Sequence, residues 1–374
     1  MDAVRGRGPA GPPFPEAGLR HPHELGCGRL EPGIPNGRPR KVLRIDATGA
    51  PFTLIGRLLV GSYITGQDQV LVTARGGLTP AQRAEIHRVV DRLLGMSVVG
   101  DGPDGVEVFN FIDPCRYELP RLLRRVVELL RLELAACHAA MVGRRAAQLG
   151  RIDPIEEEID QLYLLMARQL LLSSDDPRIA RDINVVSHHY QIGYRLVAKV
   201  LEVTGDMVQA IGNDLRENVA GLRRMPRPLP REIALRIQRL DDVLARTMAA
   251  FTTLSVVEAD ATLNSIVEAL PQDASLAQQF AQRVPDKKVA GAAQRIAGNL
   301  AMALEMLVIV NETTINRSVE PETVALTGAR VVSSWACEGD PAPRRLSELV
   351  SPRPVAHIHP ARGNARGGSG RSGA

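Results

Sequence analysis

Aromatic residues are scarce in this chain: only 3% of its 374 residues are Phe, Tyr or Trp. The core must therefore be built from aliphatic side chains, and hydrophobic residues do make up an ordinary 44% of the sequence. A mixture rich in Leu and Ala, with many Arg and Glu, favours packed helices over sheets. The composition predicts a mainly helical globular protein with one large core or two to three smaller ones.

Cysteine is also rare, and its four positions are dispersed. Cys27, Cys115, Cys137 and Cys337 show no C-x-x-C spacing, which argues against a zinc ribbon or a disulfide framework. No continuous apolar run reaches the roughly 18–20 residues that cross a bilayer. The N-terminus lacks the apolar segment of a secretory signal. We expect reduced thiols and a cytoplasmic protein.

Charge of one sign is only in small excess. The formal net charge is +4, which by itself does not indicate a nucleic-acid partner. Much of the excess comes from arginines in two tails that are also rich in Gly and Pro, at 1–39 and 340–374. Such segments cannot bury a core, so we expect both tails to be disordered.

Between the tails the sequence pattern changes once. In 40–113, the stretches FTLIGRLLVGSYIT and TPAQRAEIHRVVDRLLG predict helices, and QVLVTAR, MSVVG and VEVFNFI predict strands. This part predicts a small α/β domain. From Leu119 onward, apolar residues recur at three- and four-residue steps over long stretches, which is typical of helices.

The helical part is predicted to contain two related units. A Pro-rich segment at 225–232 separates two sets of three helical stretches, and their order recurs with a period of about 110 residues. This indicates a duplicated three-helix unit, at 115–222 and 229–320. The predicted fold is thus mainly α, with two tandem three-helix bundles after the α/β domain.

Two pairs of carboxylates mark the first of these units. Glu156 and Asp160, and then Glu202 and Asp206, are four residues apart on strongly helical sequence, so each pair lies on one helix face. Like charges at this spacing repel unless a cation or a basic partner lies between them. If the two helices face each other, the oxygen-rich cluster suits Mg²⁺, Mn²⁺ or Fe. The alternative is that both pairs belong to solvated helix faces.

Arginines are concentrated in the first long helical stretch, including Arg124, Arg125 and Arg131. One interpretation is a docking face for an acidic partner or anionic lipid headgroups. The other, which we favour, is an outer face balanced by the Glu-rich stretch that follows. No Ser-His-Asp or Cys-His order has local motif support, and closely spaced glycines lack a dinucleotide-site context. We therefore expect no enzymatic activity.

The run 112–211 resembles the PhoU family of accessory proteins of phosphate uptake. Three blocks carry the resemblance: IDP…LPRLLRR, IEEEIDQLYLLMARQL and YRLVAKVLEVTGDMVQAI. Their matching residues are Glu156, Asp160, Leu162, Tyr163, Arg168 and Gln169, then Lys199, Glu202 and Asp206. Residues 50–113 are similar to the α/β segment of PhoU-like regulators common in archaea. The second unit departs from the pattern, with Gln294 and Gly298 in place of an acidic pair and Pro271 inside its second helical stretch.

The resemblance implies a regulator of phosphate uptake and phosphate-responsive signalling, negative in sign. Its partners would be the ATPase of the phosphate ABC transporter and the phosphate sensor histidine kinase. The resemblance also implies a divalent metal or small metal cluster (Mg, Mn, Fe or Zn) on Glu156, Asp160, Glu202 and Asp206. A homodimer is expected, with membrane association only through partners.

Two other functions are compatible with the sequence. In the first, the chain is a transcriptional regulator whose residues 1–113 contact DNA, and RPRKVLR at 38–44 is its only support. In the second, it is a metal-dependent hydrolase built on a helix bundle, but the chain offers no E-x-x-H motif for such a site.

Overall fold

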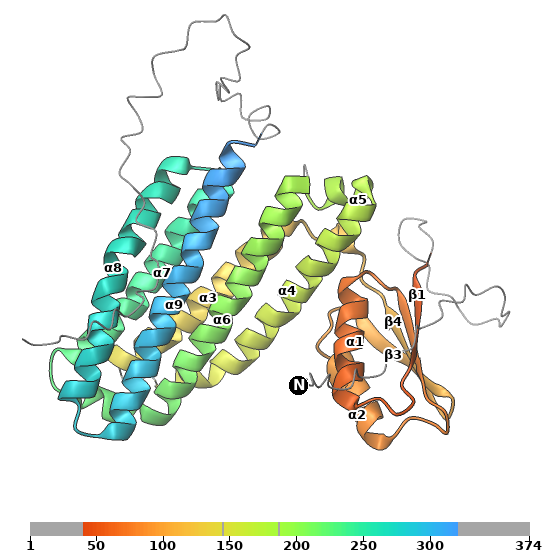
Figure 1. Cartoon of the computed structure of the whole chain (residues 1–374), viewed down its shortest axis with the longest axis horizontal. Coiled ribbons are helices and arrows are strands. Elements are labelled where there is room, and N and C mark those ends of the chain that lie inside the picture. The colour runs from red at the N-terminus through yellow and green to blue at the C-terminus, as the bar shows by residue number, and fades with distance from the viewer. Residues whose placement is uncertain (1–39, 144–145, 186–187, 321–374) are drawn as a thin grey trace, which may run out of the picture. The chain divides into compact units, whose positions relative to one another are not determined.

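The computed structural model describes residues 40–143, 146–185 and 188–320 (Figure 1). These residues form nine α-helices and a four-stranded sheet near the N-terminal end. A mainly helical fold with a small α/β part is therefore confirmed. The tails expected to be disordered, at 1–39 and 340–374, lie outside the described residues.

The sheet has the strand order β1-β2-β4-β3. Its strands are β1 (Val42–Asp46), β2 (Gln69–Thr73), β3 (Met96–Gly102) and β4 (Gly105–Asn110). β1 and β2 are parallel, and the other neighbours are antiparallel. The sequence predicted β2, β3 and β4 but missed β1, so the unit is one strand larger than expected.

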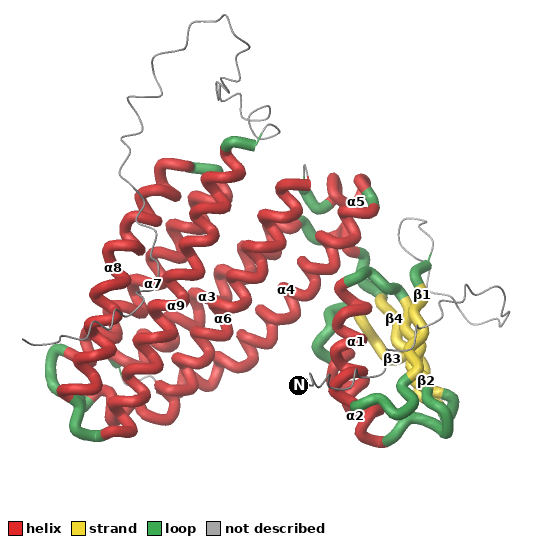
Figure 2. Tube along the Cα trace, viewed as in Figure 1, coloured by secondary structure: helices red, strands yellow, loops and turns green. Residues whose placement is uncertain are grey.

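Two helices pack against this sheet, α1 (Phe52–Ile64) and α2 (Pro80–Val90), and Figure 2 shows them on one face of it. A parallel pair of strands needs a crossover connection, and α1 provides it. The start of α2 is fixed by a capping box, because the Thr79 hydroxyl accepts from the Gln82 backbone and the Gln82 side chain accepts from the Thr79 backbone. Pro80 then occupies the first helical turn, as the Thr-Pro pattern predicted.

Six long helices follow in two sets of three. The first set is α3 (Leu119–Val142), α4 (Ile152–Asp175) and α6 (His188–Arg223), and the second is α7 (Leu229–Thr253), α8 (Val256–Arg283) and α9 (Lys287–Ser318). Within each set every helix packs on the other two, and the sets meet through α6 on α9 and α3 on α7. A short helix, α5 (Pro177–Asp182), lies between α4 and α6.

The buried side chains form two separate hydrophobic clusters. One fills the α/β part, and the other runs through all six long helices from Leu119 to Val310. Both helix sets therefore share one continuous core. Pro271 lies inside α8, which continues through it as a single helix.

One helix among the described residues, α9, is long and apolar enough to cross a membrane by length and composition alone. The sequence contains no continuous apolar run of that length, so this helix was not predicted as a candidate span. α9 packs against α6, α7 and α8, and the central helix of a helical bundle meets the same criterion.

The motif residues Arg168 and Gln169 join α4 to the α/β part. Arg168 is fully buried, and its guanidinium donates to the carbonyls of Tyr63 and Gln67 at 2.7 and 3.0 Å. The Gln169 amide donates to two carbonyls of the connecting segment at 2.7 Å each. These two residues of the PhoU-like block therefore hold the junction between the two hydrophobic clusters.

The junction is tight at Gly66, which has a φ of +83°. A Cβ atom there would lie 2.5 Å from Cδ2 of Leu172 on α4. Both the positive φ and the missing side chain are thus needed for the turn after α1 to lie against α4.

Candidate functional site

The four carboxylates predicted from the sequence lie on helices that pack together, α4 and α6. Glu156 and Asp160 come from α4, and Glu202 and Asp206 come from α6. They are close enough for the charges of the other three to raise the pKa of Glu156. Glu156 of α4 also lies against Gly205 of α6, so the two pairs lie along the same helix–helix contact.

Glu156 is the most enclosed of the four. It is buried, and neither of its carboxylate oxygens has a hydrogen-bond partner among the described residues. Gly205 on α6 makes room for it, because a Cβ atom there would lie 2.7 Å from Oε2 of Glu156. Burial, followed by the negative charges of Asp160, Asp206 and Glu202, raises the pKa of Glu156 to about 8.

A fifth carboxylate, Glu133 on α3, was not predicted. It is fully buried, and neither of its oxygens has a hydrogen-bond partner within the described ranges. Burial raises its pKa to about 9, with smaller contributions from Glu156 and Asp153. Its position was a signal that could have been used, since it follows Leu129 and Leu130 on the apolar face of α3. We call these five carboxylates the acidic cluster: Glu133, Glu156, Asp160, Glu202 and Asp206.

Basic side chains neutralise two members of the acidic cluster. Arg92 reaches Asp160 with an Nη2–Oδ2 distance of 2.6 Å, and Lys199 reaches Glu202 with an Nζ–Oε2 distance of 2.5 Å. Burial still raises the pKa of both carboxyl groups, although these cations oppose the shift. Asp206 is exposed, so the solvated-face interpretation describes Asp206 but not the buried Glu156 and Glu202.

The chemistry of the acidic cluster is suited to hard cations, because all its donors are oxygen atoms. Its geometry is less suited to them. In the part of the chain that the structure describes, no three His, Cys, Asp or Glu side chains converge closely enough to hold a metal ion. A metal would also have to compete with Arg92 and Lys199 for their carboxylates. Metal binding therefore stays a prediction.

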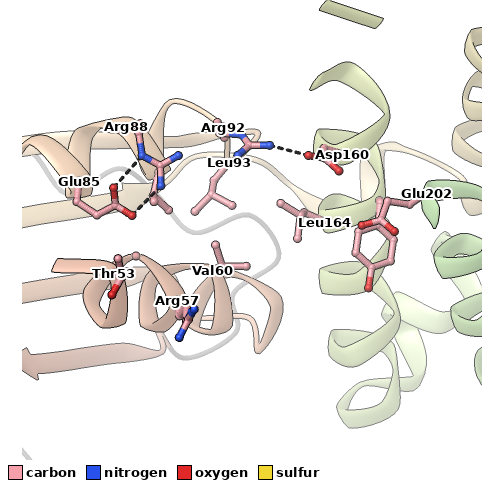
Figure 3. A pocket seen from close by; sticks show the side chains of 13 residues that line it. Thr53, Arg57, Val60, Glu85, Arg88, Arg92, Leu93, Asp160, Leu164 and Glu202 are labelled. Atoms are coloured by element: carbon pink, nitrogen blue, oxygen red, sulfur yellow. Dashed lines mark hydrogen bonds and ion pairs between the residues drawn. The ribbon is translucent and has the colours of Figure 1, made fainter. Parts of the chain in front are cut away.

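A cavity of about 510 Å³ lies beside the acidic cluster, between α1 and α2 on one side and α4 and α6 on the other. Figure 3 shows Arg92 extending from the turn after α2 toward Asp160. Arg88 lines the same cavity but is held by Glu85 on its own helix, at 2.7 Å. The apolar part of the cavity lining includes Val60, Leu93 and Leu164. Arg92 is thus a direct link between the α/β part and the acidic cluster.

The arginines predicted as a partner-binding face are largely engaged within the chain. Arg125 pairs with Glu158 on α4 at 2.8 Å, and Arg131 pairs with Asp241 on α7 at 2.7 Å. Arg124 is exposed and lines a cavity of about 490 Å³ between α3, α6 and α7. The Arg125–Glu158 pair corresponds to the favoured alternative, an outer face balanced by the Glu-rich helix.

Replacing Arg92 by alanine should raise the pKa of Asp160 further, because the positive charge that opposes the effect of burial is lost. The pair is partly exposed, with 44% and 29% of the two side chains accessible, so stability should change by less than about 1 kcal/mol. Carbon-detected NMR titration of the aspartate carboxyl groups measures the shift. Arg88→Ala is the matched control and should leave Asp160 unchanged, whereas an equal shift in both variants would contradict a direct link.

Neither a search against protein-family models nor a search of curated proteins finds a match for this chain.

Proposed function

We propose that this protein is a PhoU-like regulator of phosphate uptake and phosphate-responsive signalling. It acts by reversible contact with the phosphate transporter ATPase and the sensor kinase, and catalyses no reaction. The observation that carries the proposal is where the residues of the PhoU-like blocks lie. Glu156, Asp160 and Glu202 gather in one cluster between α4 and α6, while Arg168 and Gln169 secure the α/β part to the same helix.

The two helix sets support a tandem bundle. Their helices have 24, 24 and 36 residues in the first set and 25, 28 and 32 in the second, so the third helix is the longest in both. The second set has no acidic pair at the corresponding positions, where Gln294 and Gly298 lie exposed on α9. On this proposal the first bundle carries the signal-dependent site, and the second has kept only the packing role.

A regulator of this kind needs two states that differ in affinity for a partner, and no bond has to be made or broken. The acidic cluster offers a physical basis for two states, because it combines unpartnered buried carboxylates with ion pairs that hold other carboxylates. Arg92 belongs to the α/β part and Asp160 to α4. A change in the charge of the acidic cluster would therefore alter the Arg92–Asp160 contact at the junction with the α/β part.

The competing function, DNA contact through residues 1–113, gains little from the described part of that region. Residues 40–110 contain eight Lys and Arg against seven Asp and Glu. A nucleic-acid surface normally carries a clear excess of positive charge. Residues 1–39 lie outside the described ranges.

A pull-down with the full chain tests the proposal. The transporter ATPase and the sensor kinase are each offered as bait, in extracts of phosphate-replete and phosphate-starved cells. We expect at least one bait to retain the chain in the replete state and to release it on starvation. The double variant Asp160→Ala, Asp206→Ala should weaken retention, and Gln294→Ala in the second set is the control. Retention by neither bait in either state would rule out the regulatory function.

A further inference from the structure

The surface between α4 and α6 carries an apolar groove outside the acidic cluster. Its volume is about 630 Å³, and three of its apolar side chains are strongly exposed: Ile192 at 69%, Leu196 at 43% and Leu171 at 41%. Ile192 and Leu196 are four residues apart on α6 and so lie on one face. Single exposed apolar residues are ordinary, but a contiguous group along a groove marks an interaction site.

One edge of the groove is positively charged. Arg195 and Lys199, also four residues apart on α6, line it beside Tyr163 of α4. Arg195 donates to the Tyr163 hydroxyl at 2.7 Å, and the two cations lie 5.0 Å from the Tyr163 ring centre. Lys199 has a carboxylate partner in Glu202, whereas no carboxylate pairs with Arg195 within the described residues. Arg195 is therefore fixed in position by Tyr163, and no carboxylate of the described residues neutralises its positive charge.

We infer that this groove is the docking site for an acidic amphipathic helix of a partner protein. A helix that docks in a groove inserts apolar residues three, four and seven positions apart, and Ile192, Leu196 and Leu171 provide the apolar counterpart. Acidic residues along the flank of that helix would face Arg195 and Lys199, which favours the correct partner and orientation. The inference rests on the docking role proposed above, but it does not depend on phosphate.

A second copy of this chain fits the groove less well. A symmetric dimer brings the same patch of both subunits together. Two grooves with the same positive edge would then meet, with no carboxylate in the groove lining to compensate Arg195. Charge complementarity thus favours a different protein with an acidic helix.

Two synthetic peptides test this inference on the full chain. Both are helical 18-residue peptides with leucines three and four positions apart; one carries Glu at its remaining surface positions and the other carries Lys. We expect the Glu peptide to bind at least tenfold more tightly than the Lys peptide, as measured by fluorescence anisotropy. The double variant Ile192→Ser, Leu196→Ser should weaken binding of the Glu peptide at least tenfold. Val267→Ser, at a 55% exposed position on α8, is the control and should have no effect.

Charge reversal is the second arm of the test and removes no apolar contact. Arg195→Glu should abolish the preference for the Glu peptide, with the overall fold verified by circular dichroism. Equal binding of the two peptides, or binding unchanged by Ile192→Ser, Leu196→Ser, would overturn the inference. A dimer in sedimentation that this double variant makes monomeric would also overturn it, because a second copy would then occupy the groove. If the peptides bind as expected but neither bait retains the chain in the pull-down, the proposed role in phosphate regulation is wrong, and the groove is still a docking site for an acidic helix.

Discussion

Replacing Arg168 by alanine is expected to lower the free energy of unfolding by about 3–5 kcal/mol, the cost of removing one partner from a buried ion pair. Arg168 is fully buried, and its Nη2 lies 3.3 Å from Oδ1 of Asp68, which is itself 4% exposed. The backbone N–H of Lys41 also donates to Asp68, at 3.0 Å. Without Arg168, the buried Asp68 carboxylate loses this cationic partner. The carbonyls of Tyr63 and Gln67 lose the guanidinium as a donor, although the Tyr63 carbonyl still accepts from the Gly66 backbone N–H.

Urea unfolding followed by circular dichroism measures this loss. The α/β part and the long helices have separate hydrophobic clusters. In the variant, the α/β part should therefore unfold at a lower urea concentration than the helices, in a separate transition that the wild type does not show. Arg125→Ala is the matched control. It also breaks an interhelical pair, with Glu158 at 2.8 Å, but 45% of its side chain is exposed, so less than about 1 kcal/mol should be lost.

A double-mutant cycle separates the ion pair from general packing. Asp68→Asn keeps an acceptor for the Lys41 backbone but removes the charge that Arg168 compensates. If the buried charge is the main cost, Arg168→Ala with Asp68→Asn should be less destabilised than the sum of the single variants. Strict additivity would mean that Arg168 acts only through its packing and its carbonyl contacts.

The predictable part of the fold is the part with local signals. The Thr79-Pro80 start of α2 has its own capping chemistry, and the long helices have a regular apolar period. β1 lacks such a signal because it is a five-residue strand that, within the described ranges, lies at the edge of the sheet and pairs with β2 alone, and one of its five residues is buried. Its existence depends on β2, which lies more than twenty residues later in the chain.

In the candidate site, too, the predictable contacts are the local ones. The spacing of Glu156 with Asp160 predicted their common face, because four residues make about one helical turn. The pairing of Arg92 with Asp160 was not predictable, since it joins residues 68 positions apart in two different parts of the fold. Glu133 follows Leu129 and Leu130 by four and three residues, which places it on the apolar face of α3, but its proximity to Glu156 on α4 has no local signal in the sequence.

Replacing Glu133 by glutamine is expected to reduce the pH dependence of stability. In the unfolded chain Glu133 ionises near its ordinary value of 4.5, whereas burial raises its pKa in the folded protein to about 9. Between these two values the folded protein keeps a proton that the unfolded chain releases. Stability therefore falls as pH rises through this window, by about 1.4 kcal/mol per pH unit from this group alone.

Glutamine has no such proton to release, so the variant should lose this part of the slope. Below about pH 4.5 the two proteins should be similarly stable, because Glu133 is then protonated in both states of the wild type. By pH 8 the variant should be the more stable by several kcal/mol, on the order of 5. Urea unfolding at pH 5, 6, 7 and 8, in buffer with a chelator, measures the difference.

The control is Glu128→Gln, five residues earlier on α3, where 58% of the side chain is exposed. It should keep the wild-type slope. Glu156 has its own raised pKa of about 8. The stability of the Glu133→Gln variant should therefore still fall as pH rises, but less steeply, and the fall should end near pH 8 instead of near pH 9. A variant slope equal to that of the wild type would mean that Glu133 is ionised in the folded protein. The enclosure of the acidic cluster would then be looser than its two unpartnered carboxylates indicate.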